Sequence, residues 1–115
     1  MAKIKNDGSK DKLDSKALSL IDLIGYQDGS VVSRTLINKK VGTVTLFSFG
    51  KGEGLSEHTA PFDAMVYVVD GRSKIIIAGK PVTAKKGDLV ILPAGKPHSL
   101  HAIDKFKMLL VMIRA

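Results

Sequence analysis

Two histidines are the side chains of this sequence with the clearest potential for chemistry. His58 lies in a segment that runs from Gly52 to Gly71, and His98 lies in a second segment, from Gly87 to Ala102. An imidazole can ligate a metal ion, orient a small polar ligand by hydrogen bonding, or act as a general base, because its pKa is close to neutral. The plainer interpretation is a pair of interior histidines that are hydrogen-bonded and do no chemistry. The choice depends on the elements that position them.

Those elements are predicted to be short strands. From Gly29 to Ile113 the sequence contains about eight or nine β-branched or alternating segments, separated by turns rich in Gly, Pro and Asp. Asp70-Gly71 is a hairpin signal, and Pro81 to Ala84 is short enough to be an edge strand. Strands at this regular spacing are typical of a jelly roll or a small barrel, so the fold class is predicted to be all-β.

The N-terminal part departs from this pattern. Residues 1–15 alternate Lys and Asp with Gly and Ser, which predicts a flexible tail ahead of a single domain at 16–115. Ser15 is a candidate N-cap for apolar positions at helical spacing between Ala17 and Ile24, and Gly25 is a stop signal. The sequence therefore predicts a short N-terminal helix, of about one or two turns, that lies against the sheet.

Composition argues against several classes of protein. The chain has 115 residues and no cysteine, which excludes disulfides and thiolate metal sites. Its apolar runs are far shorter than the roughly 18 residues of a membrane helix, and its basic N-terminus lacks the apolar stretch of a signal peptide. We therefore expect a cytoplasmic protein with no membrane partner. The net charge is +7, but the basic residues are scattered and lack an aromatic platform, so no nucleic-acid partner is expected.

The spacing around His58 matches most of a known motif: Gly, five residues, His-x-His, three or four residues, Glu, six residues, Gly. Gly52, His58 and Gly71 stand at the first Gly, the first His and the last Gly. Ala60 stands where the second His is expected, and Ala64 stands where the Glu is expected.

The spacing around His98 matches the companion motif: Gly, five residues, Pro-x-Gly, two residues, His, three residues, Asn. Gly87, Pro93, Gly95 and His98 match it, and Ala102 replaces the Asn. With both motifs present, the chain resembles the cupins, which are small jelly-roll barrels of six to eight strands. The resemblance implies a cupin-type jelly-roll β-barrel over the whole strand-forming region.

The resemblance also implies an interior site with an incomplete set of metal ligands. In metal-binding cupins three His and one Glu converge inside the barrel, whereas this chain keeps only His58 and His98 of the four. Because catalytic metal sites normally keep three protein ligands, we expect no tightly bound cofactor, and at most a weakly bound divalent transition metal. Asp63, one residue before the Glu position, is a third candidate ligand if a bulge at Pro61-Phe62 turns it inward.

The predicted function is binding of a small organic or anionic ligand in the barrel interior through His58 and His98. Two imidazoles in an otherwise apolar barrel would fix the orientation of a small polar group. Phe62 is predicted either to close the mouth of this pocket or to anchor the core. One alternative is a divergent metal-dependent cupin enzyme of the oxygenase or isomerase type, and another is a small-molecule sensor module of a regulatory system. The residues leave open whether the protein is an enzyme.

A homodimer is also expected. The segment from Ala64 to Val69 is apolar on both of its faces, and a lone barrel would expose one of them as a patch. Single-domain cupins usually dimerise, which agrees with this pattern. We expect Met65, Tyr67 and Val69 to form part of the contact.

Overall fold

The computed structural model describes residues 4–8 and 12–114, and within them nearly all regular structure is β-strand. Nine strands lie between Gly29 and the C-terminus, in agreement with the number that the sequence predicts. The strands are β1 (Ile4–Asn6), β2 (Val31–Lys39), β3 (Gly42–Phe49), β4 (Gly54–His58), β5 (Phe62–Asp70), β6 (Arg72–Ile77), β7 (Lys80–Lys85), β8 (Leu89–Leu92), β9 (His98–Ala102) and β10 (Phe106–Arg114).

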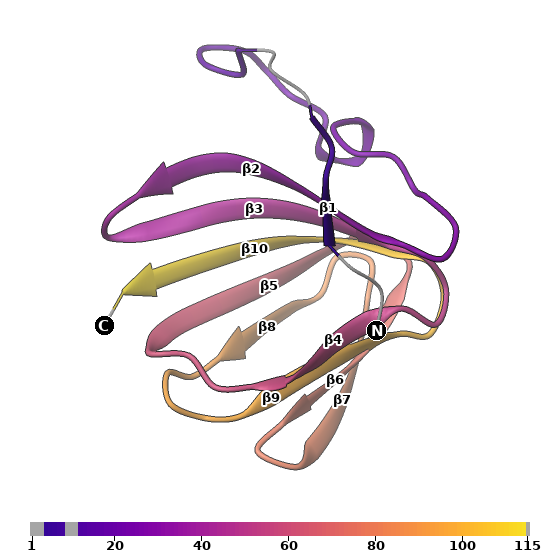
Figure 1. Ribbon diagram of the computed structural model, residues 1–115, viewed down its shortest axis with the longest axis vertical. Helices are drawn as coiled ribbons and strands as arrows, with labels where there is room; N and C mark the ends of the chain where they lie inside the picture. The colour runs from indigo at the N-terminus through magenta and orange to yellow at the C-terminus, as the bar shows by residue number, and fades with distance from the viewer. Residues whose placement is uncertain (1–3, 9–11, 115) are drawn as a thin grey trace.

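The strands form two sheets that face each other (Figure 1). The larger sheet has six strands in the order β1-β2-β3-β10-β5-β8, and the smaller has four in the order β4-β9-β6-β7. Strand β7 lies at an edge, as its length and proline predict. The all-β jelly-roll barrel expected from the sequence is confirmed.

The core lies between the two sheets because strand residues alternate between faces. On β5 the side chains of Ala64, Val66 and Val68 are buried inside the barrel. Inside the barrel, at the end of β3 and the start of β10, the rings of Phe49 and Phe106 stack with their centroids 4.5 Å apart. Both rings are fully buried and neither lines the pocket described below.

The N-terminal segment crosses the outer face of the six-stranded sheet instead of forming an α-helix. The predicted short helix is a single 3-10 turn, η1 (Leu20–Asp22). Ser15 has a positive φ of 61° and is not the N-cap, a position that Ser19 occupies without a side-chain hydrogen bond. The carbonyls of this segment instead accept hydrogen bonds from strand side chains: Ile21 from Lys107, Leu23 from Arg34, and Gly25 from Ser48. These bonds favour an extended path over helical hydrogen bonding.

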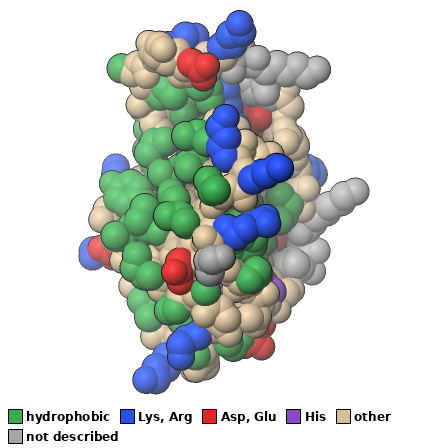
Figure 2. All heavy atoms as spheres, turned by 90° about the vertical axis from the view of Figure 1, so that its left-hand side faces the viewer, with side chains coloured by type: hydrophobic (Ala, Val, Ile, Leu, Met, Phe, Trp, Pro, Cys, Tyr) green, Lys and Arg blue, Asp and Glu red, His purple; other side chains and the backbone are tan. Residues whose placement is uncertain are grey.

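The segment covers a second apolar cluster on that outer face. Ile24 is buried there against Val32, Leu46 and Val69. The N-terminal segment leaves the rest of this outer face uncovered, and large side chains are exposed there. Figure 2 shows hydrophobic groups gathered on the side of the molecule where β2 and β10 end. The exposed large side chains on this sheet come from β2, β5, β8 and β10, and they are Ile37, Tyr67, Leu89, Ile91 and Ile113.

Strand β1 lies within the part of the sequence predicted to be a flexible tail. Ile4–Asn6 pairs in parallel with Val31–Ser33, so these three residues extend the edge of the larger sheet. Residues 1–3 and 9–11 lie outside the described part of the chain, and the division into a tail at 1–15 and a domain at 16–115 stays a prediction. None of the helical structure in the described residues is long and apolar enough to cross a membrane.

Candidate functional site

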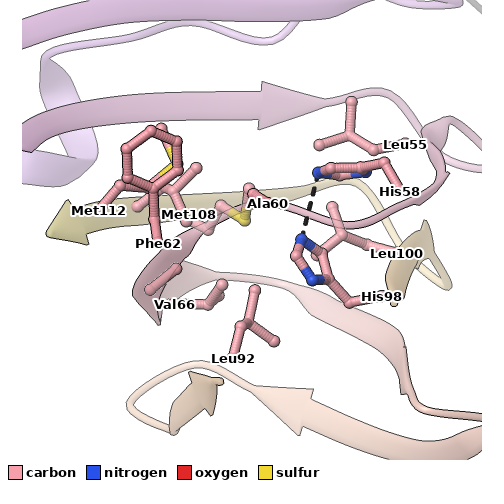
Figure 3. Close-up of a pocket in the computed structure, with 12 residues that line it drawn as sticks. Leu55, His58, Ala60, Phe62, Val66, Leu92, His98, Leu100, Met108 and Met112 are labelled. Atoms are coloured by element: carbon pink, nitrogen blue, oxygen red, sulfur yellow. Dashed lines mark hydrogen bonds between the residues drawn. The ribbon is translucent and has the colours of Figure 1, made fainter. Parts of the chain in front are cut away.

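A pocket opens between the two sheets, and most of its wall is apolar (Figure 3). It contains a cavity of about 40 Å³ within a recess of about 440 Å³ that is partly open to solvent. Figure 3 shows the imidazoles of His58 and His98 at one end and Phe62 with Met112 at the other. The lining residues are Leu55, His58, Ala60, Phe62, Ala64, Val66, Leu92, His98, Leu100, Met108, Leu110 and Met112.

The two histidines meet because β4 and β9 are antiparallel neighbours in the smaller sheet. His58 and His98 are register partners, and the register shifts between Leu55 and His58. Such an irregularity re-aims the side chains that follow it. At the start of β4, Gly54 lies so close to the backbone of Leu100 that a Cβ atom would collide with its carbonyl group. A glycine there lets the two strands approach.

The imidazole rings contact each other directly. Their Nε2 atoms lie 3.1 Å apart, the distance of a hydrogen bond, and the rings meet edge to face at 70°. Each Nδ1 faces a backbone carbonyl two residues earlier in the chain. The Nδ1 of His58 lies 2.9 Å from the oxygen of Ser56, and the Nδ1 of His98 lies 3.2 Å from the oxygen of Lys96.

These partners determine where the protons lie. A carbonyl oxygen only accepts, so each Nδ1 must carry a proton and donate it. The neutral tautomer then leaves a lone pair on both Nε2 atoms, and the contact between His58 and His98 becomes a hydrogen bond only when one further proton lies between them. The pair therefore holds a shared proton or presents two converging lone pairs to a third group.

The environment opposes the protonated form of His98. The pKa of His98 is lowered, first by burial and then by the charge of His58, while the carbonyl of Lys96 acts in the opposite direction. His58 lies at the exposed end of β4, and His98 is half-buried. One imidazole is thus accessible at the mouth while the other faces the apolar interior.

Phe62 reaches the same pocket from the first residue of β5. The guanidinium of Arg114 lies 5.5 Å from the centre of its ring, a distance within the range of a cation–π contact. The structure thus brings together three of the predicted site residues, His58, His98 and Phe62.

Asp63 does not join them. Its Oδ1 accepts a hydrogen bond of 2.9 Å from the backbone N–H of Ala94, and its side chain lies at an exposed groove on the outer face of the larger sheet. The inward-facing neighbours at the positions of the missing ligands are Ala60 and Ala64. Among residues 4–8 and 12–114, no group of three His, Cys, Asp or Glu side chains could hold a metal ion. The residues present do not fit a three-ligand metal site, and a weakly bound divalent metal stays a prediction.

The sequence motifs do not identify the apolar wall of the pocket. Met108 and Met112 are alternate residues of β10 that face inward, as does Leu110 between them. Alternation along the strand marks this face, but the same alternation is found in any core strand, so the sequence gives no signal that separates pocket from core.

The fold and the histidine-containing strands place the chain in a family. The family model for the cupin domain matches residues 45–114, which include both motifs and both histidines. This chain is a cupin.

Several solved structures share its architecture over most of its length. This cupin is 34% identical to a conserved protein of unknown function from Streptococcus pyogenes, over 88% of this chain and 89% of that one, with a TM-score of 0.85. It is 26% identical to a cupin superfamily protein from Desulfitobacterium hafniense, over 92% and 97% of the two chains, with a TM-score of 0.86.

A third structure is similar in only part of its length. The cupin 2 conserved barrel domain protein from Leptotrichia buccalis is 42% identical over 84% of this cupin but only 47% of its own chain, with a TM-score of 0.82. The search among curated proteins found no match. The similarity therefore establishes the family and leaves the function to be argued from the site.

Proposed function

We propose that this cupin binds a small organic ligand inside its barrel, with the polar group of the ligand held between His58 and His98. The observation that carries this proposal is the approach of the two Nε2 atoms, 3.1 Å apart, at one end of a pocket whose other lining residues are apolar. Small-molecule sites commonly combine an apolar wall with a few convergent polar groups in this way.

The size of the pocket limits the ligand. A cavity of about 40 Å³ accommodates only a few heavy atoms, and the wider recess leads from it to solvent. Met108 and Met112 line the cavity, and methionine side chains adapt to irregular shapes more readily than branched ones. We expect a short apolar group inside the cavity and the polar group at the histidines.

The positive charge of a shared proton on the pair would also attract an anionic group. The chain as a whole has a net charge of +7, which adds a long-range attraction for anions. A small organic ligand, neutral or anionic, is thus the proposed class, and no reaction is proposed for it.

Thermal unfolding in the presence of small neutral and anionic fragments tests this function. A fragment that binds only the folded state stabilises it by about 1.4 kcal/mol at ten times its dissociation constant. We expect the stabilisation to disappear in His58→Leu and in His98→Leu. The matched control is His101→Gln, because His101 lies on the same strand as His98 and is exposed. Equal stabilisation of all three variants would contradict the proposal.

A further inference from the structure

The numbers of hydrogen-bond donors and acceptors on the rings of His58 and His98 restrict the chemical class of the ligand, provided that the proposed pocket function holds. Both Nδ1 positions are occupied by the carbonyls of Ser56 and Lys96, so only the two Nε2 positions are available to a ligand. In the hydrogen-bonded pair, one Nε2 is a donor and the other is an acceptor. A ligand that enters between His58 and His98 must replace both partners, because an unpaired ring nitrogen in this partly buried site has a free-energy cost.

A hydroxyl group meets this requirement without a change in the number of protons. Its oxygen accepts from the protonated Nε2, and its O–H donates to the other Nε2, which gives the chain Nε2–H···O–H···Nε2. Two hydrogen bonds of ordinary length at one oxygen require the Nε2 atoms to separate to about 4.5 Å. His58 can supply that movement, because it is exposed at the end of β4.

Other polar groups fit less well. A ketone oxygen accepts from one Nε2 but leaves the second without a partner. A carboxylate also only accepts, so it needs one more proton on the pair, which the burial of His98 and the charge of His58 oppose. An ammonium group only donates, and it requires the removal of the shared proton and the burial of a charge against apolar walls.

Among the described residues that line the cavity, the histidine pair with its shared proton is the only charged group. Glu57, the neighbour of His58 on β4, is exposed, as are His101 on β9 and Lys74, which pairs with His101 from β6. Asp63 accepts a hydrogen bond from the N–H of Ala94, Arg114 lies over the ring of Phe62 at the other end of the pocket, and Lys96 is exposed. A carboxylate can use the charge of the pair only by leaving one Nε2 without a partner, so the pair favours a neutral hydroxyl.

We infer that the ligand of this pocket is a small aliphatic alcohol, whose hydroxyl inserts between the Nε2 atoms of His58 and His98 and whose hydrocarbon part lies against Met108, Leu110 and Met112. Binding of this class differs from general apolar binding in one respect. It discriminates an alcohol from the ketone of the same shape, because the ketone leaves a site nitrogen unpaired.

The test compares butan-2-ol, butan-2-one and butanoate as probes on the full-length protein with [13C]methyl-labelled methionine. The methyl signals of Met108 and Met112 report occupancy of the cavity. We expect butan-2-ol to bind at least about tenfold more tightly than butan-2-one and butanoate at pH 5.5, where the pair holds its shared proton, a preference of about 1.4 kcal/mol. In His58→Leu, a change at an exposed position, the alcohol and the ketone should bind within about twofold of each other, whereas His101→Gln should keep the preference.

The outcomes separate this inference from the function on which it rests. Shifts of both methyl signals by all three probes with equal affinity would support a ligand pocket and overturn the assignment of an alcohol. Tighter binding of butanoate would overturn it in favour of an anionic ligand. If no probe shifts either methyl signal, the pocket function fails and the inference fails with it. An alcohol preference that survives in His58→Leu would also overturn the inference.

Discussion

The Nε2 atoms of His58 and His98 lie 3.1 Å apart, and each of these histidines has its Nδ1 directed at a backbone carbonyl. The carbonyls fix the proton positions on the outer side of both rings, so the inner nitrogens behave as one unit. A change in either histidine therefore alters the hydrogen bonding of the other. This coupling underlies the predictions that concern the pocket.

Acidification should weaken the fold through His98. Its pKa is lowered in the folded state, so between that pKa and the ordinary value near 6.5 the unfolded chain binds more protons. Its contribution to the free energy of unfolding thus declines as the pH falls below about 6.5 and is smallest below the folded pKa. Urea unfolding at pH 7.5 and at pH 5 should show a larger loss for the wild type than for His98→Gln. Equal losses in both proteins would contradict this assignment.

The N-terminal segment should depend on a hydrogen bond at its end. The Tyr26 hydroxyl donates to Oδ2 of Asp70 at 2.6 Å, and the pKa of this tyrosine is raised by burial, by that hydrogen bond and by the charge of Asp70. Tyr26→Phe should lower the free energy of unfolding by about 1 to 2 kcal/mol in chemical denaturation. Tyr67→Phe is the control, because Tyr67 is exposed on the outer face of β5, and it should change stability by less than about 0.5 kcal/mol.

The exposed half of the larger sheet should bind a second copy of the chain. Ile91 and Ile113 are 56% and 60% exposed there, beside a groove of about 310 Å³ that they form with Met65 and Val111. Among the described residues that line this groove, Asp63 is the only charged one, so no basic side chain lines the proposed contact itself. We propose a homodimer through this surface.

Light scattering measures this association. The wild type should have about twice the 12.3 kDa mass of one chain at micromolar concentration, and Ile91→Glu should be monomeric. Val82→Glu, an exposed change on β7 of the other sheet, should leave the dimer intact. A wild-type species of 12.3 kDa would refute the proposed contact.

Metal content should be below one equivalent per chain. Among the residues that the structure describes, two imidazole nitrogens converge in the pocket, and Ala60 and Ala64 supply no further donor atoms. Elemental analysis of protein purified without chelator and without a nickel column should therefore find substoichiometric metal. One metal ion per chain that is lost in His98→Ala would contradict this expectation and favour the divergent metalloenzyme.

The strand pattern made the fold predictable, because turn residues and alternation are local properties of the sequence. Because side chains alternate along a strand, the sequence predicted that Ala64 faces the interior and that Asp63 could do so only at a bulge. In the structure Asp63 faces outward. A hydrogen bond between His58 and His98 was one interpretation of the sequence, but its geometry could not be predicted, since it depends on the register shift after Leu55.

The packing of the N-terminal segment over the sheet could not be predicted from the sequence either. The sequence predicted that Val69 lies on the exposed patch with Met65 and Tyr67, but Val69 is only 8% exposed, because the N-terminal segment packs over it through Ile24. The path of that segment is determined by hydrogen bonds from three separate strands, which no local pattern in the sequence records.

The central claim is that His58 and His98 hold the polar group of a ligand, and the most direct measurement is 15N–1H correlation NMR of the histidine rings. In the free protein both rings should be protonated at Nδ1. A fragment that raises the melting temperature should shift the Nε2 resonances of both and leave those of His101 unchanged. A stabilising fragment that leaves the rings of His58 and His98 unperturbed would contradict the account.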